Sequence, residues 1–131
     1  MLTPILATDD PYQAATVFVE AGWSLVFATP RDCGDPLTCV ALAGARVMLG
    51  TSLPQFLPVQ SRAHKGAGTE FHLAVPAADI DAIYQAHSQH ADSVTGIAQQ
   101  PWGERAFHAV LLGYRFLIAA DQAEPPPDSG N

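Results

Sequence analysis

The stretches ALAGARVML at residues 41–49 and VLLGYRFLI at residues 110–118 align without a gap. They share a leucine, a glycine and an arginine at matching positions, and most of the other positions are apolar in both. Each has strand-forming residues on both sides of the glycine, which predicts two strands joined by a turn. A repeat of this kind predicts that the chain consists of two related halves.

The first half has the pattern of a strand, a helix and three further strands. Asp9 or Asp10 is placed to cap the helix, Pro11 is tolerated in its first turn, and Gly22 marks its end. Strands are expected at residues 4–8, 23–29, 37–43 and 45–51. The first module therefore spans about residues 1–51.

The second half repeats this order over about residues 69–120. Its helix is expected at residues 79–90, and its strands at residues 69–75, 94–98, 104–110 and 114–120. Residues 52–68 carry prolines and glycines and predict a connecting loop. The two modules are expected to form a single domain over residues 1–120, followed by a disordered, proline-rich tail at residues 121–131.

The composition excludes several classes of protein. The 131 residues are 48% hydrophobic and 15% charged, which is enough apolar surface for one folded domain. The formal net charge is -7 and the six basic residues are scattered, so no nucleic-acid partner is expected. The sequence shows no secretion signal and no membrane-spanning run, which predicts a cytoplasmic protein without a membrane partner.

Two short motifs carry a family resemblance. Together with the tandem modules, DIDAIY at residues 79–84 and PWGERAF at residues 101–107 resemble the glyoxalase, bleomycin-resistance and extradiol-dioxygenase superfamily, also called the vicinal oxygen chelate superfamily. The block around Trp102 resembles its bleomycin-resistance branch. The resemblance implies an α+β fold of two tandem βαβββ modules, whose curled mixed sheets surround a cleft, and a homodimer.

The resemblance also implies where a metal would be held in the metal-dependent members. The matching positions carry His72, but Leu2, Met48 and Leu117 at the places of the other ligands. Because hydrocarbon side chains cannot replace carboxylate or imidazole ligands, neither a metal nor another cofactor is expected. A metal enzyme would need His108 or Glu70 as a substitute ligand. His72 is either a core histidine or a donor that faces a ligand.

Strand alternation extends the predicted ligand wall beyond His72. In the same register, Glu70 shares the face of His72, Arg115 that of Leu117, and Arg46 that of Met48. The predicted ligand-binding residues are Glu70, His72, Arg46, Met48, Trp102, Arg115 and Leu117. Alternatively, Trp102 packs beneath the strands and the arginines are solvated or paired with acidic groups. Glu104 and Arg105 are expected to form a surface pair.

Such a wall suits a flat, amphipathic molecule and requires no catalytic residue. We therefore expect sequestration of a small molecule, such as an antibiotic or another aromatic ligand, as in bleomycin resistance. The acidic chain favours a cationic ligand, whereas the arginines favour an anionic or neutral one. The alternatives are an enzyme of the superfamily, metal-dependent or with His72 or Glu70 as general base, and a structural or regulatory dimer with a vestigial cleft.

Overall fold

The computed structural model describes residues 1–53 and 57–120, and the predicted tail at residues 121–131 lies outside them. The first half contains β1 (Ile5–Thr8), α1 (Pro11–Glu20), β2 (Ser24–Ala28), β3 (Leu37–Leu42) and β4 (Ala45–Thr51). The linker contains a 3-10 helix, η1 (Val59–His64). The second half contains β5 (Glu70–Val75), α2 (Ile80–His90), β6 (Ser93–Val94), β7 (Ala98–Gln99), β8 (Arg105–Leu111) and β9 (Tyr114–Ala120).

Each half forms one mixed sheet, and the strand orders correspond. The first sheet has the order β1-β4-β3-β2 and the second the order β5-β9-β8-β6, with β7 also paired to β8. In both, the first strand of the module runs parallel to the last, while the remaining pairs are antiparallel. The predicted α+β fold of two related modules is confirmed.

Local sequence signals explain the first helix and both repeated turns. The Asp10 carboxylate accepts the backbone N–H groups of Tyr12 and Gln13 at 2.9 and 3.4 Å, which caps α1. Ala43 and Gly44 have φ angles of 51° and 85°, and the equivalent residues of the second half have φ angles of 53° and 83°. Both hairpins therefore close with two left-handed residues, which matches the twist of paired strands.

The strand predicted at residues 94–98 is interrupted. Val94 pairs with Ala109 and Ala98 with Ala106, so this side has one more residue between the pairs than β8 has. The extra residue breaks the ladder as a bulge does. At the break, the Thr95 hydroxyl accepts the backbone N–H of His108 at 2.9 Å.

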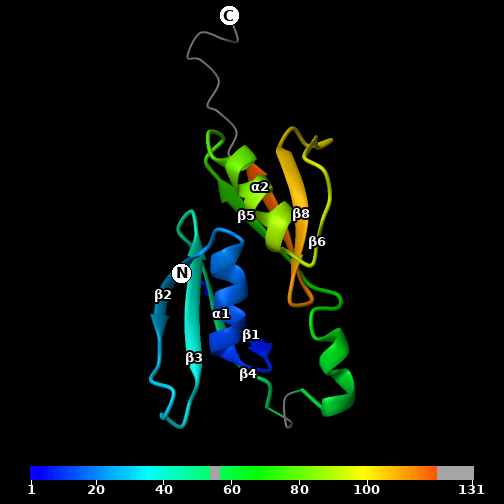
Figure 1. Ribbon diagram of the computed structural model, residues 1–131. Coiled ribbons are helices and arrows are strands. Elements are labelled where there is room, and N and C mark those ends of the chain that lie inside the picture. The colour runs from blue at the N-terminus through cyan, green and yellow to red at the C-terminus, as the bar shows by residue number, and fades with distance from the viewer. Residues whose placement is uncertain (54–56, 121–131) are drawn as a thin grey trace, which may run out of the picture.

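A single aromatic core joins the two halves. Each helix covers one face of its own sheet, and both helices lie on the same side of the molecule (Figure 1). Between them, Trp23 packs edge-on against Phe18 and Phe116, with ring centroids 5.1 and 5.4 Å away. The side chains of Phe18 and Phe116 are fully buried. Because these rings come from both halves, the modules share one core and are expected to unfold together.

A buried hydrogen bond links the first half of the chain to helix α2 of the second half. The indole N–H of Trp23 donates to Nε2 of His87 at 3.0 Å, and the other ring nitrogen lies 2.8 Å from the Ile83 carbonyl oxygen. Nε2 of the fully buried His87 accepts the indole N–H, so it carries no proton. The proton of the neutral ring is therefore on Nδ1, which donates it to the Ile83 carbonyl oxygen. Burial lowers the pKa of His87, and the bond to Ile83 offsets part of that effect.

This link predicts that acid destabilises the protein. His87 has a lowered pKa in the folded state and its ordinary value of 6.5 when unfolded, so the unfolded chain binds the proton first. The free energy of unfolding should fall as the pH drops below about 6.5, by at most about 1.4 kcal/mol per pH unit from this group. Urea denaturation at a series of pH values measures the slope. His87→Gln should flatten it, whereas His90→Gln, on the exposed side of α2, should not. Equal slopes in all three proteins would contradict the assignment.

Candidate functional site

The face of the second sheet that points away from the helices carries a group of polar side chains, which we call the polar face. Along β5, Leu73 and Val75 are buried in the core, while Glu70 and His72 alternate with them and are exposed. Beneath these polar groups lies a small apolar cluster separate from the main core, made of Ala106, Leu117 and Ala119.

Two rows of residues cross the polar face. In one row, His72 is paired with Leu117, which is paired with His108 on the next strand. In the adjacent row, Glu70 is paired with Arg115. Five of the predicted ligand-binding residues, Glu70, His72, Trp102, Arg115 and Leu117, thus belong to this face or its rim.

Glu104 organises the rim of the polar face. One of its carboxylate oxygens, Oε1, lies 3.1 Å from Nε2 of His72 and accepts the indole N–H of Trp102 at 2.5 Å. Because a carboxylate only accepts, Nε2 of His72 carries the proton and Nδ1 of a neutral ring is left as an acceptor. Trp102 is 54% exposed, so it does not pack beneath the strands. The bond instead holds its indole ring in place at the surface.

The predicted pairing of Glu104 with Arg105 is wrong. Arg105 binds the Asp81 carboxylate at 3.0 Å, while Glu104 binds His72 and Trp102. Neighbouring residues of an extended chain point to opposite faces, so the two side chains diverge. Glu104 is the site residue that sequence reasoning missed, since only the folded chain brings it next to His72.

The charged groups of the polar face are paired. The Glu70 carboxylate lies 3.2 Å from Arg115 and 3.4 Å from Nε2 of His108. This agrees with the alternative in which Arg115 is the partner of an acidic residue. Apart from the two imidazoles, the charged groups in these contacts are the carboxylates of Glu70 and Glu104 and the guanidinium of Arg115. They leave an excess of one negative charge.

The equivalent face of the first sheet is apolar. A continuous cross-strand row runs over its four strands through Phe27, Cys39, Met48 and Ile5. Phe27 is 37% exposed and Ile5 is 65% exposed, so no part of the described chain covers the row's ends. We call this row and its surroundings the apolar face. Arg46 lies one row further along, close enough to Cys39 to offset partly the rise that burial causes in the thiol's pKa.

The structure corrects one of the positions that were matched to the metal ligands of the metal-dependent proteins. Ile5 pairs with Met48 as His72 pairs with Leu117, so Ile5 is the counterpart of His72. Leu2, which was predicted to hold that place, precedes β1 and is almost fully exposed. The two halves have slightly different spacings between their first and last strands, and only the strand register reveals this.

The donor set does not fit a divalent metal. The four positions that were matched to metal ligands carry the imidazole of His72 and the hydrocarbon or thioether side chains of Ile5, Met48 and Leu117. Within residues 1–53 and 57–120, no three His, Cys, Asp or Glu side chains are arranged to hold an ion. Metal sites in proteins need about three such ligands. That the protein binds no metal therefore stays a prediction.

The hydrogen bonds and ion pairs of the described residues do not connect the polar face with Arg46 and Met48. None of the five principal cavities in the described part of the chain is lined by His72, Trp102 or Leu117. In a single copy, the polar face is therefore an open surface. Glu70 and Arg115 border a cavity of about 480 Å³ that they share with the linker.

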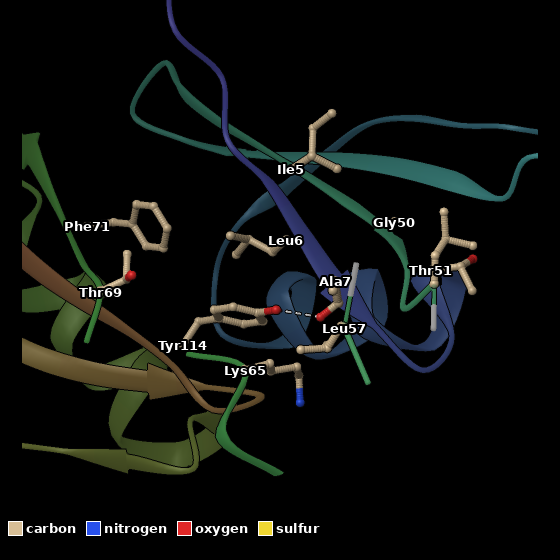
Figure 2. Close-up of a pocket in the computed structure, with 11 residues that line it drawn as sticks. Ile5, Leu6, Ala7, Gly50, Thr51, Leu57, Lys65, Thr69, Phe71 and Tyr114 are labelled. Atoms are coloured by element: carbon tan, nitrogen blue, oxygen red, sulfur yellow. Dashed lines mark hydrogen bonds between the residues drawn. The ribbon is translucent and has the colours of Figure 1, made fainter. Parts of the chain in front are cut away.

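The largest of these five cavities lies elsewhere, at the junction of the two halves. It has a volume of about 600 Å³ and lies between the edge strands β1 and β5. Figure 2 shows Phe71 and Thr69 on one side of it and the β1 residues Ile5, Leu6 and Ala7 on the other. Tyr114 crosses the junction, and its hydroxyl donates to the Ala7 carbonyl oxygen at 2.6 Å.

Comparisons with known proteins identify the fold. No family model matches the chain, and no curated protein matches it. The bleomycin resistance determinant encoded on transposon Tn5 has a similar structure, with a TM-score of 0.63 and 15% identity, over 94% of this chain and 98% of that one. TioX from Micromonospora sp. ML1 has a TM-score of 0.67 and 20% identity, over 95% and 98% of the two chains.

A solved structure that contains a metal ion also has this fold. A mutant of FosX, a genomically encoded fosfomycin resistance protein from Listeria monocytogenes, was solved with Mn(II) and 1S,2S-dihydroxypropylphosphonic acid. Its TM-score is 0.66 at 8% identity, over 93% of this chain and 92% of that one. The predicted resemblance to the glyoxalase and bleomycin-resistance proteins is thus confirmed for the fold. Fold alone does not decide function. Across residues 1–53 and 57–120, no helical segment has both the length and the hydrophobicity that a membrane span requires.

The Glu104 contacts predict a measurable titration. The hydrogen bond from Trp102 is the largest cause that lowers the pKa of Glu104, and the bond from His72 comes next. Trp102→Phe should raise this pKa toward its ordinary value of 4.5, and His72→Ala, which removes both a hydrogen bond and a charge interaction, should raise it as well. Titration of the carboxyl ¹³C signal by NMR measures both changes. Arg105→Gln is the control and should leave the signal unchanged, and an unchanged Glu104 pKa in Trp102→Phe would contradict the assignment.

Proposed function

We propose that this protein sequesters a planar, cationic aromatic molecule on the polar face without changing it chemically. The observation that supports this is that the positions compared with metal ligands, apart from His72, carry apolar side chains, Leu117 in the floor of the polar face and Ile5 and Met48 on the apolar face. The fold it shares with the Tn5 bleomycin resistance determinant supports a role in antibiotic binding. A cytoplasmic location, predicted from the sequence, is part of the proposal.

The polar face has the chemistry to hold such a ligand. Trp102 presents an exposed indole ring that is oriented by its bond to Glu104. Indole rings stack on conjugated rings and attract cations above their faces, with contributions of about 0.5–2 kcal/mol. The two carboxylates of the face and the chain's formal charge of -7 favour a cation over an anion.

A second copy of the chain would close the site. The polar face forms no cavity around His72 in one copy, and the apolar face leaves Ile5 and Phe27 exposed. An apolar surface of this kind gains stability when another surface covers it. We therefore propose a homodimer in which the apolar face of one copy covers the polar face of the other. Met48 would then reach the ligand from the second copy, and the Arg46 guanidinium on the same face would offset part of the negative charge of the polar face.

Ligand titration tests the sequestration. Quenching of tryptophan fluorescence should report binding from a panel that includes ethidium, metal-free bleomycin and copper-loaded bleomycin. Trp102→Ala should weaken the affinity for the ligand that binds by about tenfold, from loss of the stacking contact, in calorimetry, which does not depend on the fluorophore. A chelator should leave the affinity unchanged. Absence of binding across the panel, or dependence on an added divalent metal, would contradict the proposal.

Sedimentation analysis tests the homodimer. Phe27→Glu places a charge within the proposed contact and should convert the dimer to a monomer, because a buried unpaired carboxylate is costly. Val59→Glu is the matched control, since Val59 is an equally apolar residue on the exposed side of η1, with 66% of its surface accessible. A monomeric wild-type protein would overturn the proposed arrangement.

A metal-independent enzyme is the second candidate, and one observation favours it. The Glu104 carboxylate orients His72 by its bond to Nε2, which leaves Nδ1 able to accept a proton from a substrate. If this candidate is correct, the ligand identified above should be converted during incubation, and His72→Ala should abolish the conversion without abolishing binding. Recovery of the unchanged ligand supports sequestration.

A further inference from the structure

The junction cavity is separate from the polar face and has its own chemistry. Its walls come from both modules, with β1 and the end of β4 on one side and β5 and β9 on the other (Figure 2). None of the predicted ligand-binding residues lines it. Its volume of about 600 Å³ is within the range of small-molecule sites.

Most of the cavity wall is apolar. Ile5, Leu57 and Phe71 line it together with Leu53. Ile5 is 65% exposed and Leu53 is 44% exposed, so large hydrocarbon side chains remain in contact with water at its mouth. An apolar body placed there would remove that surface from water, which is favourable at about 25 cal/mol per Å².

A single cation lies at the wall of this cavity. Lys65 is the only lysine in the sequence, it is half-buried, and its Nζ lies 5.8 Å from the centre of the Tyr114 ring. Across residues 1–53 and 57–120, its ammonium group takes part in no ion pair. Asp9 and Asp10 line an adjoining cavity with Lys65, and the Asp10 carboxylate is engaged by the start of α1.

The backbone holds Lys65 in this place. The next residue, Gly66, is buried against the turn between β8 and β9, where an added Cβ would overlap the carbonyl oxygen of Gly113. This contact seats the linker on the turn that precedes Tyr114. A cation that is positioned beside an apolar cavity and forms no ion pair within the described residues matches a ligand with an anionic head and an apolar body.

We propose that the junction cavity binds a small carboxylate with an apolar body, with the carboxylate on Lys65 and the body against Leu53, Leu57 and Phe71. The hydroxyl group of Thr69 also lines the cavity and can donate to the same carboxylate. Such a ligand would contact both modules and would stabilise their association through differential binding to the folded state.

Decanoate and 2-naphthoate are the probes, and calorimetry measures their affinities. Both should bind and raise the melting temperature, whereas 1-decanol and decylamine, which lack the carboxylate, should bind at least tenfold more weakly than decanoate. Lys65→Met should weaken decanoate binding by roughly tenfold to a hundredfold, because a hydrogen bond to a charged group is lost. Lys65→Arg should retain most of the affinity. Leu57→Asp, in the linker wall, should abolish binding without altering the shared core.

The single lysine allows a direct readout. Reductive methylation with ¹³C-formaldehyde labels Lys65 and the N-terminal amine alone. Decanoate should move the Lys65 signal in the NMR spectrum and leave the N-terminal signal unchanged. A Lys65 signal that stays in place at saturating decanoate, equal binding of decanol, or no binding of either carboxylate would overturn the proposal.

This inference does not rest on the proposed function. Trp102→Ala should leave the affinity for decanoate unchanged, and Lys65→Met should leave the affinity for the planar cation unchanged. If decanoate instead competes with the cation and its binding depends on Trp102, the junction site is wrong, whatever the outcome for the polar face.

Discussion

The shared aromatic core is the constraint on which the rest of the structure depends. Trp23 of the first half packs between Phe18 and Phe116 and donates its indole N–H to the buried His87 of the second half. A buried indole or imidazole without a partner is costly, so each of these polar groups requires the other. The modules are therefore joined by their helix sides, and the opposite face of each sheet is left open.

The two open faces differ in chemistry although the modules share a fold. The first sheet presents a row from Phe27 to Ile5, and the second presents His72, Glu70 and Arg115 above a floor of small apolar residues. In the proposed homodimer, the apolar surface and the tryptophan-rimmed polar surface would form opposite walls of one binding site. This difference between halves, rather than the fold they share, supports a binding role.

The side chains at a few positions are the basis for predicting that this chain binds no metal, although a protein of the same fold holds one. FosX shows that the fold can hold Mn(II), and there the structure contains the ion together with a phosphonic acid. In this chain the compared positions carry Ile5, Met48 and Leu117, which can pack against a ligand but cannot ligate a hard cation. The junction cavity, with Lys65 at its wall, offers a second and oppositely charged environment within the same small fold.

Sequence patterns by themselves determined the order of elements and both hairpin turns, and they placed His72 and Glu70 on one face of a strand, because turn chemistry and strand alternation are local properties. Tertiary structure alone decided that Glu104 binds His72, that Ile5 and not Leu2 is the counterpart of His72, and that Trp23 meets His87. These pairings depend on register and on loops of unequal length, which no residue pattern encodes. The cavity beside Lys65 exists for the same reason, since its walls come from segments that meet only in the folded chain.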